Sequence, residues 1–240
     1  ATRTVEKGLL AHSMHAYFLR PGDPKKKIIY EVDPIRDGKS FTTRNVIARQ
    51  GGIAIFSTSI SFHIEEPGLS HQFEALQVPP PEELESDFDR WSRLAKDNPD
   101  TIDPPLLQPI ERKPVRPRDY LNPQPQEPQQ QIWFRALGDL GDDLSRHQTI
   151  LAFLSDFGLL GTALLPHPYS GMNADLQAAS LDHALWFHQP FKADEYLLYC
   201  LDSPIAAGAR GFSRGSFYTR DGILVASTAQ ESLQRIRTPS

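Results

Sequence analysis

One carboxylate lies where the sequence otherwise predicts a hydrophobic core. Asp156 stands within residues 152–160, a run in which Ser155 is the only other polar side chain. A carboxylate removed from water must find partners or shift its pKa. We therefore treat Asp156 as a candidate functional residue. The structural alternative is that Asp156 caps a helix end before Gly158.

Two neutral polar side chains occur in predicted strands that would face the same helix. Ser180 lies in residues 176–182, and Gln230 lies in residues 224–231. Together with Asp156, they would bring an acid, a hydroxyl and an amide to one helix. Taken singly, a Ser or a Gln on a strand is usually only solvated surface.

Other patterns that suggest chemistry do not have the required context. The run Gly211-Phe-Ser-Arg-Gly215 fits the nucleophile elbow of hydrolases, but that motif needs a helix after the turn, and here a strand continues. Asp182 and His183 are adjacent in a strand and should point to opposite faces. Cys200 lies in an apolar strand and is typical of a core. The eight histidines show no ligand spacing, so we expect no metal site.

A repeated sequence indicates the fold. His15-Ala-Tyr-Phe-Leu-Arg-Pro21 resembles Ala184-Leu-Trp-Phe-His-Gln-Pro190 at an offset of 169 residues, and Ser57-Thr58 resembles Ser227-Thr228. Strand-like runs broken by Gly-containing turns predict antiparallel hairpins in both copies. We expect strands at residues 14–20, 28–36, 41–50 and 53–64, and again at 177–188, 195–205, 209–220 and 223–232. Ile60 takes the place of Gln230 in the first copy, so acid, hydroxyl and amide combine only in the second.

The second copy also contains a helix that must be buried. A strand-like run at 131–137 precedes a predicted helix from about 142 to 159, which is apolar on nearly all faces after Thr149. A curved antiparallel sheet around such a helix is the hotdog arrangement, so we predict an α+β double hotdog. Only 12 residues precede Ser13. We therefore expect the first half to lack its opening strand and most of its helix, about 40 residues, which would expose an apolar sheet face.

Proline divides the chain into three parts. Thirteen of the 21 prolines lie between Pro67 and Pro128, and runs of proline cannot stand inside helices or sheets. We predict a first hotdog half at 1–66, a proline-rich connection at 67–130 with a short helix near 82–96, and a second half at 131–240 that carries the site. A net charge of −5 argues against a nucleic-acid partner, and no segment is apolar enough to span a membrane.

Three segments together resemble one enzyme family. Residues 12–23, 182–188 and 222–231 resemble the type II acyl-CoA thioesterases, double-hotdog enzymes of bacteria and of peroxisomes. In that family an Asp on the second helix, a Ser or Thr on a strand and a Gln near the C-terminus hold the hydrolytic water, and the matching positions are Asp156, Ser180 and Gln230. The resemblance implies hydrolysis of medium- to long-chain acyl-CoA without a cofactor, since coenzyme A is part of the substrate. It also implies a homodimer or homotetramer through sheet pairing, in the peroxisomal matrix if the source is eukaryotic or in the cytoplasm if it is bacterial, and we expect no targeting signal within these 240 residues.

The resemblance leads to a mechanism and to alternatives. Asp156 would deprotonate a water, backbone N–H groups near Gly158 would stabilise the oxyanion, and Arg210 and Arg214 are candidates for the coenzyme A phosphates by their place in the sequence. A non-catalytic acyl-CoA-binding hotdog is the alternative. A hotdog dehydratase would need a His beside the acid, and His147 lies too far along the helix.

Overall fold

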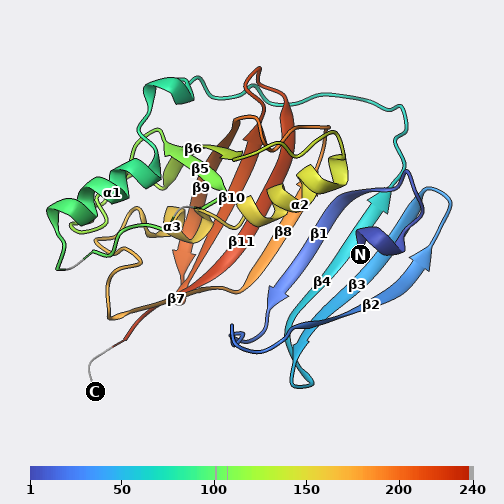
Figure 1. The fold of residues 1–240 in the computed structure, drawn as a ribbon, viewed down its shortest axis with the longest axis horizontal. Coiled ribbons are helices and arrows are strands. Elements are labelled where there is room, and N and C mark those ends of the chain that lie inside the picture. Colours follow the sequence, from blue (N-terminus) through green and yellow to red (C-terminus); the bar gives the residue numbers. More distant parts are fainter. Residues whose placement is uncertain (101, 107, 238–240) are drawn as a thin grey trace.

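The computed structural model describes residues 1–100, 102–106 and 108–237. Within these ranges, eleven strands form one open sheet in which every pairing is antiparallel. Their order is β2-β3-β4-β1-β8-β11-β10-β9-β6-β5, and β7 also pairs with β11 (Figure 1). The architecture is α+β, as the sequence predicts.

The first half of the sheet contains four strands, and the second contains seven. In the first half they are β1 (Leu10–Phe18), β2 (Ile29–Asp37), β3 (Phe41–Gln50) and β4 (Ile53–His63). In the second half they are β5 (Ile110–Pro114), β6 (Gln129–Ala136), β7 (Leu176–Ser180), β8 (Asp182–Phe187), β9 (Leu197–Ala207), β10 (Arg210–Tyr218) and β11 (Leu224–Ile236). The predicted hairpins are present; β5 was not predicted.

The pairing of β1 with β8 joins the two halves into one sheet. Its register runs from Ser13 opposite Trp186 to Tyr17 opposite Asp182. These strands carry the two repeated segments, so the copies meet along equivalent edges. Gln148 of α2 (Leu144–Leu154) adds a link, because its Nε2 donates to the backbone oxygen of Ala11 at 2.8 Å.

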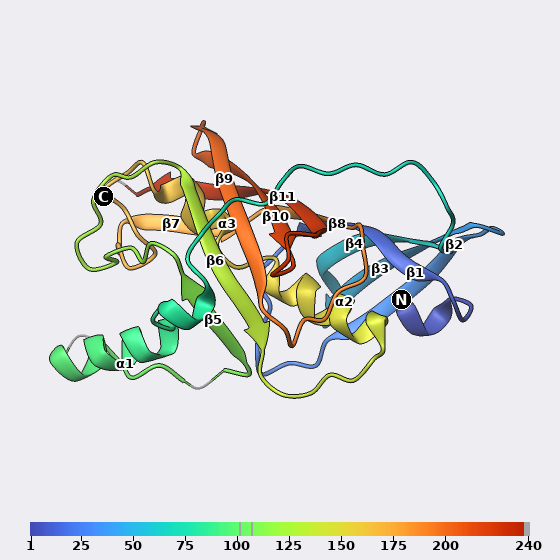
Figure 2. The ribbon, with the colours of Figure 1, turned by 90° about the horizontal axis from the view of Figure 1, so that it is seen from above.

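Two short helices cover one face of the second half, where the sequence predicts a single helix. α2 ends at Leu154, and α3 (Leu159–Leu164) begins after a turn at residues 155–158 (Figures 1 and 2). Gly158 has a φ of 94°, a left-handed conformation that interrupts the helix and that glycine adopts without strain. The expected continuous helix from 142 to 159 is therefore wrong, and its interruption falls next to Asp156.

The core of the second half lies between these helices and the sheet. Leu151, Leu154 and Leu159 contribute from the helical side, while Tyr199 and Phe217 contribute from β9 and β10. The two rings stack with their centroids 3.7 Å apart. Gly215 makes room for this stack, because a Cβ at that position would overlap the ring of Tyr199.

The connection between the halves contains more structure than a linker. The 3-10 turn η2 (Pro81–Glu83) precedes α1 (Asp87–Asp97), in agreement with the helix expected near 82–96. Ser86 caps α1 by accepting a hydrogen bond from the backbone of Asp89. α1 then packs against β5, the edge strand of the second half (Figure 2).

The first half is less covered in the described part of the chain. Its helical element there is the short turn η1 (Thr2–Thr4). Large apolar side chains on β1 and β2 remain accessible, among them Phe18, 39% exposed, and Tyr30, 63% exposed. Within the described residues, no helix has the length and apolar character needed to cross a membrane.

Candidate active site

The structure brings the three predicted site residues together. Asp156 lies in the turn between α2 and α3, Ser180 ends β7, and Gln230 lies on β11. The hydroxyl of Ser180 donates to Asp156 Oδ1 at 3.3 Å. Gln230 Nε2 in turn donates to Ser180 Oγ at 2.9 Å. The three side chains therefore form one hydrogen-bonded row that ends on a carboxylate.

The burial of these groups differs from the expectation. Asp156 is exposed, so the prediction of a buried carboxylate is wrong. The reason is the break in the helix: the turn directs Asp156 outward, and Ser155, with no exposed surface, takes the interior position. Gln230 is 1% exposed and so is not solvated surface. The amide of Gln230 is held in the interior, whereas the carboxylate of Asp156 lies at the surface, where water can reach it.

A fourth side chain, His183 of β8, extends the row into the core. His183 Nδ1 lies 2.7 Å from Gln230 Oε1, and its Nε2 lies 2.8 Å from Ser155 Oγ. The ring is 3% exposed, and burial lowers its pKa. A neutral ring that donates from Nδ1 leaves Nε2 as an acceptor, and the single hydroxyl proton of Ser155 can serve either this nitrogen or the backbone oxygen of Ala152, 3.0 Å away. With Nδ1 donating to Gln230 Oε1, the bonds from His183 through Gln230 and Ser180 point toward Asp156.

A β-bulge explains why sequence reasoning missed His183. β11 pairs Ser232 with Ser180 but Ala229 with Ala184, so the strand at 180–184 holds one extra residue. The extra residue brings Ser180 and His183 to the same face, although strict alternation would separate them. Asp182 points elsewhere and accepts from the backbone of Glu231 at 2.7 Å.

The turn that carries Asp156 is fixed from two sides. Tyr199, which is fully buried, donates its hydroxyl to the backbone oxygen of Ser155 at 2.9 Å. On the other side, Gln130 Nε2 donates to the backbone oxygen of Gly158 at 3.1 Å. These bonds hold the backbone before and after Asp156, so the carboxylate is presented in a defined place.

The other residues that the sequence suggested are buried or paired within the protein. Ser213 Oγ is buried and donates to the backbone of Leu159 at 2.8 Å, so it is no exposed nucleophile. Burial raises the pKa of Cys200 to about 11. Arg210 pairs with Glu231 at 2.7 Å, and Arg214 pairs with Asp202 at 2.5 Å.

His147 is held by backbone groups at the far end of α2, with Nε2 2.8 Å from the oxygen of Gly141 and Nδ1 accepting from Ala193. It thus has no place in the row that ends on Asp156. In the described ranges, no three His, Cys, Asp or Glu side chains are grouped so that they could hold a metal ion.

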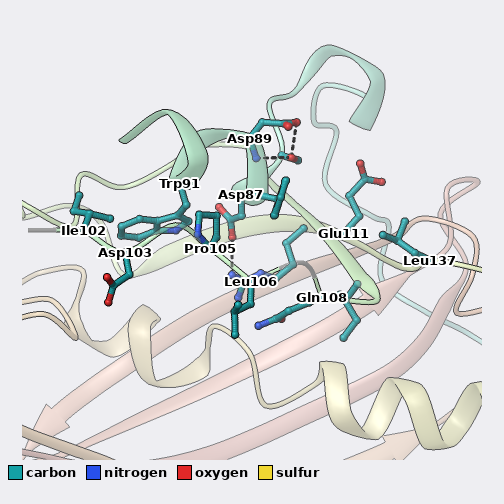
Figure 3. Close-up of a pocket in the computed structure, with 14 residues that line it drawn as sticks. Asp87, Asp89, Trp91, Ile102, Asp103, Pro105, Leu106, Gln108, Glu111 and Leu137 are labelled. Carbon is teal, nitrogen blue, oxygen red and sulfur yellow. Dashed lines mark hydrogen bonds and ion pairs between the residues drawn. The ribbon is translucent and has the colours of Figure 1, made fainter. Parts of the chain in front are cut away.

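A hollow of about 460 Å³ lies between α1 and β5, and Asp156 is not among the residues that line it (Figure 3). Its wall carries carboxylates from Asp87, Asp89, Asp103 and Glu111 and the ring of Trp91. Burial raises the pKa of Asp87. Size alone does not make this the reaction site, because none of the three predicted site residues lines it.

Comparison with known proteins gives consistent matches over nearly the whole chain. The pattern of a family described as "Acyl-CoA thioesterase" matches residues 105–233, and that of an "Acyl-CoA thioesterase N-terminal domain" matches residues 1–63. Acyl-coenzyme A thioesterase 8 of Homo sapiens is 41% identical over 99% of this chain and 77% of its own length. Acyl-CoA thioesterase 2 of Haemophilus influenzae is 32% identical over 98% of this chain and 83% of its own.

Solved structures agree. Acyl-CoA thioesterase II TesB2 from Mycobacterium marinum superposes with a TM-score of 0.81 and 40% identity, over 99% of this chain and 85% of that one. A protein described as having the hot dog fold, from Alicyclobacillus acidocaldarius, is 17% identical with a TM-score of 0.74 over 100% of this chain and 84% of its own, and supports the fold alone.

Proposed function

This chain belongs to the acyl-CoA thioesterase family and is an acyl-CoA hydrolase, and on that premise we propose that Asp156, Ser180 and Gln230 hold the water that attacks the thioester. One observation carries the proposal: the hydrogen-bonded row from Gln230 to Asp156 ends on an accessible carboxylate at the rim of a rigid core. Such a carboxylate can take a proton from a bound water, and its two neutral neighbours can orient that water.

The reaction can be followed atom by atom. Asp156 accepts a proton as the water oxygen bonds to the thioester carbonyl carbon, and the carbonyl oxygen becomes an oxyanion. Backbone N–H groups of the turn around Gly158 are the proposed donors to that oxyanion. The intermediate collapses, the carbon–sulfur bond breaks, and the proton on Asp156 passes to the departing coenzyme A sulfur. The products are a free acid and coenzyme A, with no covalent enzyme intermediate.

His183 is proposed as a positioning residue for this row. It does not reach Asp156, but its Nδ1–H fixes which end of the Gln230 amide faces Ser180. With the amide in that orientation, Ser180 accepts from Gln230 and keeps its own proton for Asp156. Without His183, the amide of Gln230 would be free to turn, and the hydrogen bonds of the row would no longer be fixed to run toward Asp156.

The preferred acyl group is proposed to be of medium to long chain. The apolar side chains next to the carboxylate support this: Phe153 is 57% exposed, and its ring meets Phe157 edge to face at 5.3 Å. A hydrocarbon chain that covers such rings gains free energy in proportion to its buried area. A series of saturated acyl-CoA substrates of increasing length tests the preference, and a rate that is highest for acetyl-CoA would contradict it.

Assembly and location also remain proposals. We infer a homodimer or homotetramer through sheet pairing, which light scattering of the purified protein would test. Relatives come from a human and from a bacterium, and one yeast relative, 35% identical over 31% of this chain, is named as peroxisomal. We infer a peroxisomal matrix location if the source is eukaryotic and a cytoplasmic one if it is bacterial. Imaging of a tagged full-length protein would decide between them.

The test of the catalytic assignment is Asp156→Asn. The variant keeps the shape of the side chain but removes the base, so we expect kcat to fall by about 10²- to 10⁴-fold. Release of free coenzyme A is followed with a thiol reagent. Asp142→Asn, which changes an exposed carboxylate just before α2, is the matched control and should stay at the wild-type rate. Hydrolysis by Asp156→Asn at a rate close to that of the control would contradict the assignment.

A further inference from the structure

A small cavity of about 100 Å³ beside the catalytic turn is rich in arginine. Arg90 of α1, Arg112 of β5, and Arg116 and Arg118 from the segment after β5 all line it, and Asp87 supplies the one carboxylate of its wall. The lining also includes Phe157 and Gly158, directly after Asp156. The cavity therefore borders the turn that carries Asp156, although Asp156, Ser180 and Gln230 do not themselves line it.

The charges of this arginine cavity do not balance. Arg112 pairs with Asp87, with Nη2 and Oδ2 3.2 Å apart. Among the residues that the structure describes, Arg90, Arg116 and Arg118 have no carboxylate within the 4.0 Å of an ion pair. Four arginines therefore line one small space, and Asp87, already paired with Arg112, is the one carboxylate among the residues of its wall.

Two of these groups also have buried N–H donors without an acceptor. Arg118 is 6% exposed; its Nη2 donates to the backbone oxygen of His167 at 2.8 Å, while its Nε has no partner. Arg90 donates through Nη2 to the backbone oxygen of Arg118, while its buried Nη1 has none. Burial lowers the pKa of Arg118. A buried charge with unused donors is costly, and an anion would remove both penalties.

We propose that the arginine cavity binds a phosphate group of the coenzyme A part of the substrate. This inference rests on the proposed function, because it takes the thioester to lie at Asp156. Guanidinium groups match phosphate oxygens in geometry and charge, and about 100 Å³ is the space of roughly three waters, enough for one phosphoryl group. Arg210 and Arg214, the arginines suggested by the sequence, are already neutralised by Glu231 and Asp202.

The experiment compares two substrates that differ in phosphate. An acyl-CoA and the S-acyl pantetheine of the same chain share the thioester, but only the first carries phosphates. Arg116 is exposed, so Arg116→Ala should fold normally. We expect its KM for the acyl-CoA to rise about tenfold or more with kcat little changed, and its KM for the pantetheine ester to change far less. Arg210→Ala, which removes an arginine outside the cavity, is the control.

A second measurement distinguishes coenzyme A phosphate from free phosphate. In the wild-type protein, inorganic phosphate at constant ionic strength should raise the KM for the acyl-CoA and not that for the pantetheine ester. Arg118→Met should abolish this competition. If phosphate raises the melting temperature without raising the KM for the acyl-CoA, the cavity binds free phosphate and the proposal is wrong. It is equally wrong if Arg116→Ala affects both esters alike or neither. Failure of the proposed function has another signature, an Asp156→Asn variant that hydrolyses both esters normally.

Discussion

Replacing His183 tests whether a buried side chain that never meets the substrate controls the reaction. His183→Leu removes the hydrogen bond between Nδ1 and Gln230 Oε1, which are 2.7 Å apart, and largely keeps the volume of the ring. Gln230 is 1% exposed, so its oxygen would be buried without a donor, at a cost of about 1–3 kcal/mol. If the amide of Gln230 turns over, this cost is avoided, but its oxygen then faces Ser180 in place of the Nε2 donor. Either outcome weakens the row, and the same free energy corresponds to a loss of about 5- to 150-fold in kcat.

His183→Asn separates orientation from packing. An asparagine amide can place its N–H close to the position of Nδ1 while giving up the contact with Ser155, so we expect it to recover much of the lost kcat. KM should change little in both variants, because His183 touches only protein atoms in the row. The assay is coenzyme A release over a range of substrate concentrations, accompanied by thermal unfolding of each variant.

The pH dependence of stability adds an independent readout. Burial lowers the pKa of His183 below its ordinary value of 6.5, so the unfolded chain binds the proton more readily. The contribution of His183 to stability is therefore complete above about pH 6.5 and falls as the pH drops toward the folded-state pKa. His183→Leu and His183→Asn should both lack this part of the decline.

The control is His147→Leu. His147 is also buried and bonds to backbone groups, at Gly141 and Ala193, but stands outside the row. It should lower the melting temperature and leave kcat unchanged. The reasoning is refuted if His183→Leu keeps a wild-type kcat, or if His183→Asn is no better than His183→Leu while both lose only stability.

Three further outcomes follow from the packing and the charges. Gly215→Ala should lower the free energy of unfolding by about 1–3 kcal/mol in urea titrations, because the new Cβ meets the ring of Tyr199, whereas Gly171→Ala, which meets nothing within 4 Å, should have a much smaller effect. Alkylation of Cys200 by iodoacetamide should rise with pH up to about 11, since burial raises the thiol pKa to about 11; a midpoint near that of a free thiol would contradict its burial. Asp194, whose pKa is lowered mainly by the N–H of Leu140, should stabilise the protein at neutral pH and lose that effect as the pH falls below its ordinary value of 3.8. Asp194→Asn should then differ from wild type in melting temperature at pH 7 and converge with it near pH 2.

The sequence predicts the fold better than it predicts the interior of the site. The alternation of residue types and the Gly turns give the hairpins at β3–β4 and β10–β11, because these contacts are local. β5 was missed, since its five residues contain Arg, Lys and Pro and acquire strand character only by pairing with β6.

For the site, the residue types and the family resemblance selected Asp156, Ser180 and Gln230, which the structure brings into contact. They did not select His183, because a one-residue bulge decides which face it occupies. The sequence also failed to predict that the side chain of Asp156 is exposed. The alternative of a helix end before Gly158 allowed for the break, but the sequence does not show that the turn places Ser155 inside and Asp156 outside.

The pairing of β1 with β8 has a consequence during synthesis. β1 can pair with β4 soon after both strands have been synthesised. The other edge of β1 stays unpaired until residues 182–186 leave the ribosome, about 170 positions later. At about 5–20 residues per second, that edge stays open for roughly 10–30 s. An unpaired strand edge is a template for pairing with other chains. Translation speed and chaperone capacity should therefore affect the soluble yield of this enzyme.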